Sequence, residues 1–245
     1  MYKDILIVSD NLSLCLQILP IVEPYKDRNF HFATSPFSDV GEFQKKLNKE
    51  VTVVDMKDEL SLQKLIKHYD LIISIHCKQI FPATLVKSVK CINIHPGYNP
   101  INRGWYPQVF AIANDLPVGA TIHEIDEQLD HGKIIARAFV DKSSIDSSLT
   151  LYNKITQKEI ELLNENIDNI LNDSYNAFYP ESEGNLFLKK DFNQLCAINL
   201  EEKKTVGETI NMLRALSHGD FKNAFYTDYN TGKKIYININ LSEEC

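Results

Sequence analysis

The sequence predicts an α/β fold, with a Rossmann-like, mostly parallel sheet followed by a short C-terminal helix and β-hairpin. Short apolar runs alternate with amphipathic stretches in the first half of the chain, as in βαβ units. The aliphatic run at 70–75 shows little polar alternation, which is typical of a central parallel strand covered on both faces. This pattern predicts strands at 5–8, 31–34, 51–54, 71–75 and 91–94, separated by helices at 12–22, 40–47, 60–68 and 83–89.

The second half of the chain has a different pattern. Residues 105–114 predict a helix, and 121–125 and 133–140 predict two strands joined by an acidic loop. A long amphipathic helix is expected over about 149–171, with Ser147 or Ser148 as its cap, because apolar residues recur there at helical intervals. We expect residues 1–176 to form the main domain and residues 177–245 a small C-terminal segment.

The C-terminal segment begins with a stretch, 178–200, that is rich in Pro, Gly and Asn. Thr205 to Glu208 has the capping-box pattern, and the helix behind it ends near Gly219. Residues 223–229 and 234–241 predict a β-hairpin turned at 230–232. An exposed hairpin has edges for self-pairing, so we expect a homodimer.

Composition excludes several classes of function. The net charge of −7 and a pI of about 5.5 leave no basic excess for a broad nucleic-acid surface. The five scattered cysteines favour neither a disulfide framework nor a structural zinc site. With no leader-like N-terminus and no run of membrane-spanning length, the expectation is a cytoplasmic protein without a membrane partner.

Asn93 and His95 lie two residues apart near the end of a predicted strand, so their side chains leave the same face of the sheet. Pro96-Gly97 follows directly and is expected to end the strand. With Asp130, this pair supplies an amide, an imidazole and a carboxylate, the groups that acyl transfer to an amine requires. Taken singly, each is better explained as a turn residue, a strand-end histidine or a loop cap. Their occurrence together favours catalysis.

Four motifs carry a family resemblance: Asn93-Ile-His-Pro, Arg103-Gly104, Gly119-x-Thr-x-His123 and Leu129-Asp130-x-Gly132. Together they resemble the folate-dependent formyltransferases. The resemblance implies that Asn93, His95 and Asp130 are catalytic and that N10-formyltetrahydrofolate delivers the formyl group. No metal is implied, and the local His and Asp spacings fit no compact zinc signature. His123 either supports the site or is a buried strand histidine.

The resemblance also implies a pterin pocket between two loops, which would bind mainly through backbone groups. Its expected residues are Lys78, Gln79, Ile80 and Phe81 on one side and Glu127, Gln128 and Leu129 on the other. The neighbouring His76-Cys77 is a poor nucleophilic pair, because adjacent strand residues point to opposite faces. The absence of Gly-x-Gly-x-x-Gly after Val8 argues against a nicotinamide enzyme.

The acceptor is predicted from segments outside this shared core. Ser9 to Leu12 lacks a Gly-rich phosphate loop, and neither a basic C-terminal domain nor an N-terminal regulatory domain is expected. Segments 76–82, 102–108 and 213–224 resemble the sugar N-formyltransferase branch, whose nucleotide-linked aminosugars, such as dTDP-4-amino-4,6-dideoxyglucose, enter bacterial surface polysaccharides (O-antigen). Implied substrate contacts are Tyr98, Arg103, Trp105, Tyr106, His123, Arg214, His218 and Lys222. Transfer to another amine, such as another nucleotide aminosugar or glycinamide ribonucleotide, hydrolysis of the donor and a silent binding module remain alternatives.

Overall fold

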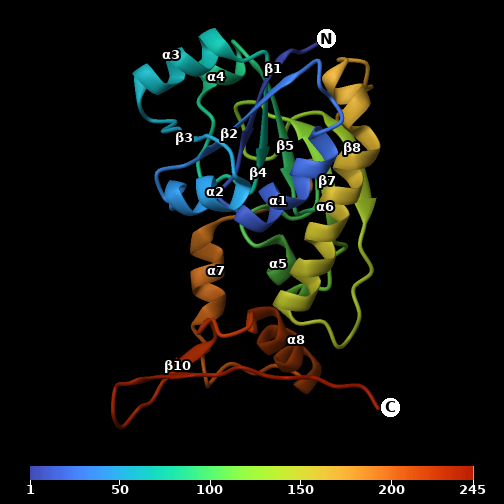
Figure 1. Ribbon diagram of the computed structural model, residues 1–245. Helices are drawn as coiled ribbons and strands as arrows, with labels where there is room; N and C mark the ends of the chain where they lie inside the picture. The colour runs from blue at the N-terminus through green and yellow to red at the C-terminus, as the bar shows by residue number, and fades with distance from the viewer. Residues whose placement is uncertain (245) are drawn as a thin grey trace.

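A seven-stranded sheet forms the centre of the computed structural model, which describes residues 1–244 (Figure 1). The strand order is β3-β2-β1-β4-β5-β7-β8. The strands are β1 (Asp4–Val8), β2 (Asn29–Thr34), β3 (Val51–Val53), β4 (Leu71–Ile75), β5 (Lys90–His95), β7 (Gly119–Glu124) and β8 (Ile134–Phe139). β1 to β5 run parallel, whereas β7 is antiparallel to both β5 and β8. The predicted Rossmann-like, mostly parallel α/β fold is confirmed.

Helices cover both faces of the sheet. On one face lie α1 (Leu12–Val22), α2 (Val40–Leu47) and α6 (Ser148–Leu171); on the other lie α3 (Glu59–His68) and α4 (Ala83–Val86). In β4, Leu71 and Ile73 pack toward α1 and α6, while Ile72 packs toward α3 and α4. Both faces of this strand are buried, which accounts for its continuous aliphatic sequence.

Polar caps define where the helices begin. Asn11, Asp39 and Asp58 each accept a hydrogen bond from a backbone N–H in the first turn of α1, α2 and α3. Ser147 caps α6 through a capping box with Thr150, as one of the two predicted caps. These caps supply partners for orphan N–H groups at the helix starts.

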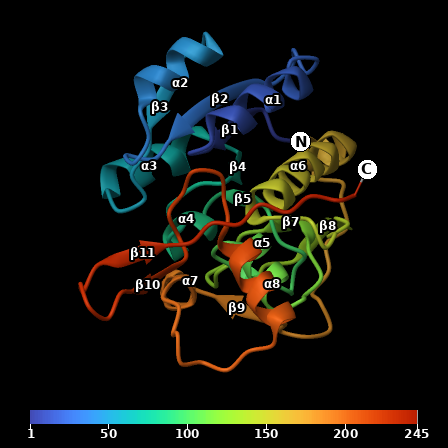
Figure 2. The same cartoon turned by 90° about the horizontal axis from the view of Figure 1, so that it is seen from below.

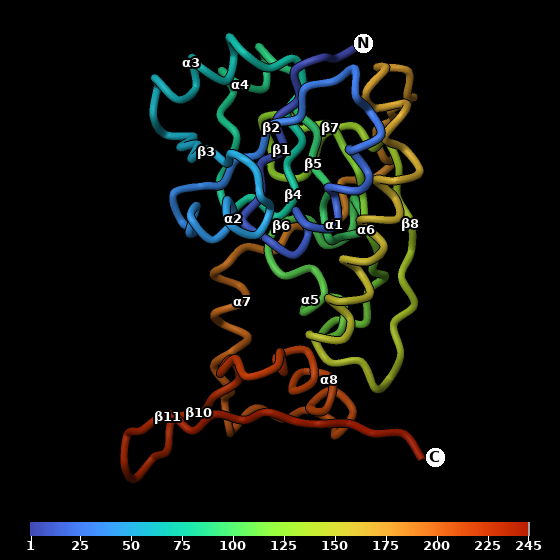
Figure 3. The backbone as a smooth tube through the Cα atoms, in the orientation of Figure 1, coloured from blue at the N-terminus to red at the C-terminus, as the bar shows by residue number. Residues whose placement is uncertain are grey.

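The C-terminal segment packs below the sheet, against the carboxyl ends of its parallel strands (Figures 1 and 3). It contains α7 (Lys189–Cys196), α8 (Val206–Leu216) and the hairpin β10 (Phe225–Thr227) with β11 (Lys234–Tyr236). Seen from below, the hairpin lies near α7, to one side of α5 (Pro107–Ala113), and the chain that follows it crosses in front of the central sheet (Figure 2). An apolar cluster joins α5 and the first turns of α6 to Cys196 of α7 and Leu216 of α8.

Several elements differ from those predicted. The helix expected from 105 begins at Pro107, because Tyr106 has a φ of 52° and cannot belong to the first helical turn. The paired part of the hairpin is shorter than expected, and α4 ends at Val86. Helix α7 and a small parallel sheet, β6 (Arg103–Gly104) with β9 (Leu186–Phe187), were not predicted. Within residues 1–244, no helix is both long and apolar enough to span a bilayer.

Candidate active site

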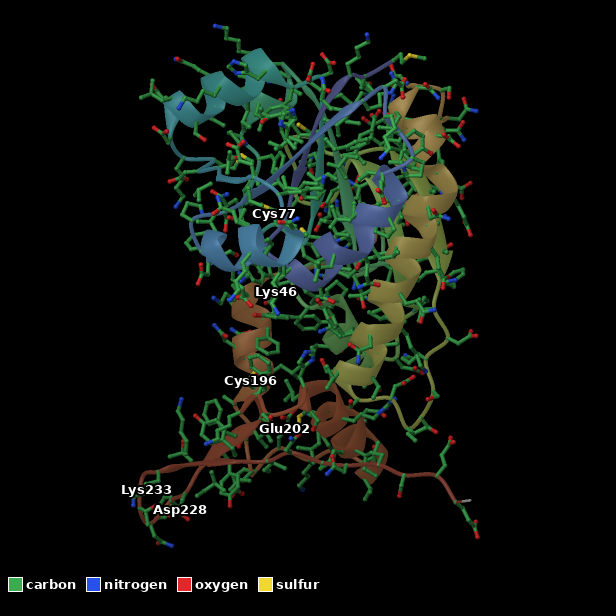
Figure 4. The ribbon with its side chains drawn as sticks, viewed as in Figure 1. Lys46, Cys77, Cys196, Glu202, Asp228 and Lys233 are labelled. Carbon is green, nitrogen blue, oxygen red and sulfur yellow. The ribbon has the colours of Figure 1, made fainter. Side chains whose placement is uncertain are left out.

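A cavity of about 360 Å³ opens at the carboxyl ends of β4 and β5, near Cys77 in Figure 4. Open α/β sheets characteristically bind ligands at this edge. The lining residues come from both expected loops and from the strand ends: Ser74, 76–81, 93–96, 104–108, His123, 125–130 and Tyr152. The cavity therefore collects the three predicted catalytic residues and all seven predicted pterin-pocket residues.

Asn93, His95 and His123 converge on the carboxylate of Asp130. Asn93 Nδ2 donates to Asp130 Oδ1 at 3.1 Å, and the backbone N–H of Gly104 donates to Oδ2 at 3.0 Å. His95 Nδ1 lies 3.5 Å from Oδ2, and His123 Nε2 lies 3.5 Å from Oδ1. The side chains of Asn93 and His95 thus lie on the same face of the sheet, as predicted. Asp130, in the acidic loop between β7 and β8, contacts both of them.

Asp130 is held as a carboxylate. Its φ of 48° is left-handed, a conformation that Asp tolerates better than most residues. Burial would raise its pKa, but His95, His123 and the Gly104 N–H together hold the pKa well below its usual range. The site therefore contains a fixed negative charge beside two imidazoles.

His95 is almost fully buried, with 3% of its surface exposed. Burial lowers its pKa, and the opposing effect of Asp130 is smaller. Both ring nitrogens face oxygens that only accept, but Nε2 has hydrogen-bond geometry to the Asn102 carbonyl at 3.3 Å, whereas Nδ1 lies 3.5 Å from Asp130 Oδ2; this geometry favours the tautomer with the proton on Nε2. Nδ1 is left as the proton acceptor, next to a carboxylate that stabilises the resulting imidazolium.

Three further residues hold this arrangement. A Cβ on Gly97 would lie 2.4 Å from His95 Nε2, so only glycine fits there. Thr121 Oγ1 donates to the Gly97 carbonyl at 2.7 Å and accepts from the Asn99 N–H at 3.0 Å. Asn99 Nδ2 in turn donates to the backbone carbonyl of Asp130 at 2.8 Å. Gly97 and Thr121 belong to sequence segments already singled out, but their supporting roles were not predicted.

The loop at 78–81 is anchored to the sheet. Asp10 accepts from the Lys78 N–H at 2.7 Å and also binds Ser35 and Ser38, linking the ends of β1, β2 and β4. The side-chain amide of Gln79 faces the β3–α3 loop, where it donates to the Val54 carbonyl at 2.8 Å and accepts from the Met56 N–H at 2.9 Å. The side-chain amide of Gln79 is therefore already hydrogen-bonded, and a ligand in the cavity would contact the backbone of Gln79 instead.

Apolar side chains wall the same end of the cavity. Phe81 is buried, whereas Ile80 is 77% exposed beside it. Leu129 contributes from the opposite loop, and Glu127 there forms an ion pair of 2.6 Å with Lys87. This end suits a flat heterocycle, because apolar walls combine with loop backbone groups.

The predicted substrate contacts divide into two groups. Trp105, Tyr106 and His123 line the large cavity. Arg103 lines a smaller cavity of about 160 Å³ on the other side of Asp130, and its guanidinium lies 3.7 Å from Glu183. His218 lies behind Tyr152, with ring centroids 5.6 Å apart, and contacts Ser148 at 3.0 Å.

Like His218, the other predicted contacts lie outside both cavities. Tyr98 stacks on Phe139 with ring centroids 3.7 Å apart. Arg214 is buried, and its guanidinium donates to the carbonyls of Ser143 and Asp146 at 2.9 and 2.8 Å. Lys222 is exposed and lies 5.9 Å from the ring centre of Tyr236. In this structure these three side chains support the fold or face solvent.

Two residues of α6 that contact the cavity-lining His76, Tyr152 and Glu159, were not predicted from the sequence. His76 contacts Tyr152 and the fully buried Glu159 of α6. A signal was present in the sequence, because Glu159 interrupts the apolar face formed by Leu151, Ile155 and Leu163 at helical spacing. Burial raises the pKa of the adjacent Cys77 thiol to about 12, which argues against a His76–Cys77 nucleophilic pair.

Metal binding has no support from this geometry. Among residues 1–244, no group of three or more His, Cys, Asp or Glu side chains is arranged to hold a metal ion. The imidazoles of His95 and His123 instead bond to backbone carbonyls and to Asp130.

Comparison with known families gives two matches. Residues 34–167 match the family described as formyl transferase. Residues 191–243 match the N-formyltransferase dimerization C-terminal domain.

Individual relatives agree with these matches. The chain is 50% identical over 181 residues to the dTDP-4-amino-4,6-dideoxyglucose formyltransferase of Mycobacterium tuberculosis, covering 74% of this chain and 77% of that protein. A 4-N formyltransferase from Francisella tularensis superposes with a TM-score of 0.93 at 41% identity over 99% of both chains. A sugar N-formyltransferase from a Shewanella species gives 0.94 at 38% identity, again over 99% of both.

Proposed function

The chain belongs to the formyl transferase family, and on that premise we propose that it formylates the 4-amino group of dTDP-4-amino-4,6-dideoxyglucose with N10-formyltetrahydrofolate as donor. The observation that carries this proposal is the convergence of Asn93, His95 and Asp130 in one cavity. The similarity to a relative with this activity supports the choice of acceptor.

The donor fits the end of the cavity formed by the two loops. Ile80, Phe81 and Leu129 provide an apolar wall for the pterin, and backbone groups of 78–81 and 127–129 provide hydrogen-bond partners. Bound there, the donor supplies an activated formyl carbon. The remaining cavity, toward Trp105, Tyr106 and Tyr152, is left for the aminosugar.

The catalytic residues divide the work of transfer. Asn93 Nδ2 contacts both Asp130 Oδ1, at 3.1 Å, and His123 Nε2, at 3.3 Å, so it can keep Asp130 and turn the hydrogen that faces His123 toward the formyl oxygen, where negative charge develops. His95 Nδ1 receives the proton that the nitrogen loses once the new C–N bond forms, and returns it to the leaving nitrogen of the donor. Asp130 stabilises the imidazolium during that interval.

The acceptor side is proposed from aromatic and polar groups at the cavity wall. Trp105 and Tyr106 can stack on a sugar or base, and the ring centroids of these two residues lie 5.6 Å apart. Arg103, His218 and Lys222 are kept as proposed diphosphate contacts, which would require a bound acceptor to extend beyond the large cavity. Arg214 and Tyr98 are weaker candidates, because their present contacts are internal.

We also propose that residues 1–176 form the catalytic domain and that 177–245 serve substrate binding and dimerisation. The match of 191–243 to a dimerization domain supports a homodimer. Action in the cytoplasm and use of the product in O-antigen or a related surface polysaccharide are further parts of the proposal.

A formyl-transfer assay tests the function. The protein is incubated with N10-formyltetrahydrofolate and a panel of dTDP-, GDP- and UDP-linked 3- and 4-aminosugars, together with glycinamide ribonucleotide. We expect mass spectrometry to show a gain of one formyl unit on the dTDP-linked 4-aminosugar. Gain on none of the sugars removes the proposal, and release of tetrahydrofolate without any amine indicates hydrolysis instead.

Single variants test the roles of the three residues. Asn93→Ala, His95→Ala and Asp130→Ala should each lower turnover by about a hundredfold or more, as is usual when a transition-state group is removed. Circular dichroism checks that each variant remains folded. Near-normal rates in all three would refute the mechanism.

A further inference from the structure

Glu159 is a fully buried carboxyl group on the apolar face of α6, with 0% of its surface exposed; burial raises its pKa, and the neighbouring His76 opposes that shift. Its hydrogen-bond partner is His76, whose Nε2 lies 2.8 and 3.1 Å from the two carboxylate oxygens. Burying a carboxylate is costly unless it is compensated, and the His76 imidazole is the group that compensates it here.

The cap of α1 determines the direction of a hydrogen-bond chain that ends at Glu159. Asn11 uses Oδ1 to accept from the Leu14 N–H, so its Nδ2 must be the atom that donates to the Tyr152 hydroxyl at 3.0 Å. Tyr152 then donates its own hydrogen to His76 Nδ1 at 3.1 Å, and His76 Nε2–H donates to Glu159. The order is Asn11, Tyr152, His76, Glu159.

This chain reaches the catalytic cavity. His76 and Tyr152 both line it, together with Asn93 and His95. The last paired residues of β4 and β5 are Ile75 and Ile94, so His76 follows on one strand where His95 ends the other. Neighbouring strands lie about 4.8 Å apart, which puts the two histidines at the same level of the site.

An acceptor that binds as an ammonium needs a proton acceptor besides His95. An aliphatic amine with a pKa near that of an α-amino group, about 8, is mostly an ammonium at pH 7. It must lose one proton before it can attack and a second after the C–N bond forms. The second proton returns to the donor's nitrogen through His95, so the first has no destination in that mechanism.

We propose that Tyr152, His76 and Glu159 form a relay that takes the first proton from the acceptor's ammonium group. This inference rests on the proposed function, because it needs an amine as the acceptor. Tyr152 is the group that contacts the amine, while His76 and Glu159 act through it.

The proton movements balance. An ammonium N–H bond breaks, its electron pair stays on nitrogen, and the proton passes to the Tyr152 oxygen as that oxygen gives its own proton to His76 Nδ1. The products are a neutral amine, an intact Tyr152 and an imidazolium paired with the Glu159 carboxylate. His76 returns the proton to solvent after product leaves, which matches the one proton that formylation of an ammonium releases.

The surroundings of His76 are compatible with this step. Charged or titratable neighbours are Glu159 and Tyr152 from α6, His95 from β5, Asp10 from the β1–α1 loop, and Cys77 and Lys78 next along the chain. Burial raises the pKa of Tyr152 to about 12, so it keeps its proton at rest and serves as a conduit. His218, edge-on to Tyr152, has a lowered pKa because of burial and brings no competing charge at pH 7.

The pH dependence of kcat/KM for Tyr152→Phe tests the relay. At pH 7 we expect a fall of about tenfold to a hundredfold relative to the unaltered enzyme. At pH 9 the loss should shrink to less than about threefold, because the amine then arrives already deprotonated. His76→Asn and Glu159→Gln should show the same recovery.

Tyr25→Phe is the matched control, since Tyr25 also binds α6 through its hydroxyl, 2.7 Å from Asp168, but outside the cavity. It should leave kcat/KM unchanged at both pH values. An equal loss at pH 7 and pH 9 in Tyr152→Phe indicates a purely structural role and overturns the relay while leaving the proposed function intact. Absence of transfer by the unaltered enzyme overturns both.

Nitrogen NMR of the His76 ring gives a measurement that does not depend on turnover. The resting enzyme at neutral pH should carry the proton on Nε2, as the donor order requires. A ring protonated on Nδ1 alone would reverse the chain and overturn the proposal, even if every variant folds poorly.

Discussion

Gly97→Ala should impair catalysis by displacing His95. The added Cβ would lie 2.4 Å from His95 Nε2 and 2.9 Å from the Asn102 carbonyl oxygen, which are the two ends of one hydrogen bond. Ordinary contact begins at 3.4 Å, so the ring must move by roughly 3.4 − 2.4 = 1.0 Å. A displacement of about 1 Å can cost about a hundredfold in rate, equivalent to about 2.7 kcal/mol.

Steady-state kinetics with the aminosugar acceptor measures this loss, and a crystal structure of the variant measures the shift of the ring. Gly207→Ala is the control, because a Cβ there meets nothing within 4 Å in the first turn of α8. It should leave activity unchanged and stabilise the fold by up to about 1 kcal/mol. An unchanged kcat/KM for Gly97→Ala, or a lower kcat/KM with the His95 ring still in place, would show that Gly97 does not act by positioning His95.

Other expectations follow from particular contacts. Asp130 has a lowered pKa, so the stability it contributes is present above the unfolded value of about 3.9 and is lost as pH falls through the folded pKa. The difference in unfolding free energy between the unaltered protein and Asp130→Asn should therefore be constant above about pH 7.5, change around and below about pH 6.5 because Asp130 also raises the pKa of the buried His95, and change again below about pH 4 in urea titrations. Arg214→Met should lower the melting temperature while leaving the acceptor KM within about twofold, because the guanidinium binds internal carbonyls; a large rise in KM would restore Arg214 as a substrate contact. Cys77 lines the cavity but should resist iodoacetamide at pH 8, where a pKa of about 12 leaves about 0.01% thiolate, and rapid labelling detected by mass spectrometry would contradict the raised pKa.

Much of the fold could be predicted because the local signals agree with the tertiary structure. The aliphatic run of β4 is buried on both faces, and the predicted caps Ser147 and Thr205 do cap α6 and α8. Helix α7 was missed because it has only eight residues in a polar stretch. Its packing depends on distant side chains, with Phe192 at 4.2 Å between ring centroids from Tyr106.

The candidate site likewise contains residues that the sequence predicted and residues that only tertiary packing brings together. Asn93, His95 and Asp130 could be predicted because strand geometry and motif spacing bring them together. Tyr152 and Glu159 meet His76 through the packing of α6 on the sheet, across more than 70 residues of sequence, so no local pattern reveals the contact. Arg214 and Tyr98 show the converse, since residue type alone did not distinguish a ligand contact from an internal one.

The apolar cluster beneath the sheet limits how this protein can be divided. Leu151 and Ile155, near the start of α6, belong to the same core as Ala215 and Leu216 of α8. A chain cut after residue 176 would expose that surface, so the C-terminal segment is not a detachable module. Exchange of acceptor specificity between relatives, in evolution or by engineering, would have to move α5 and the first turns of α6 together with it.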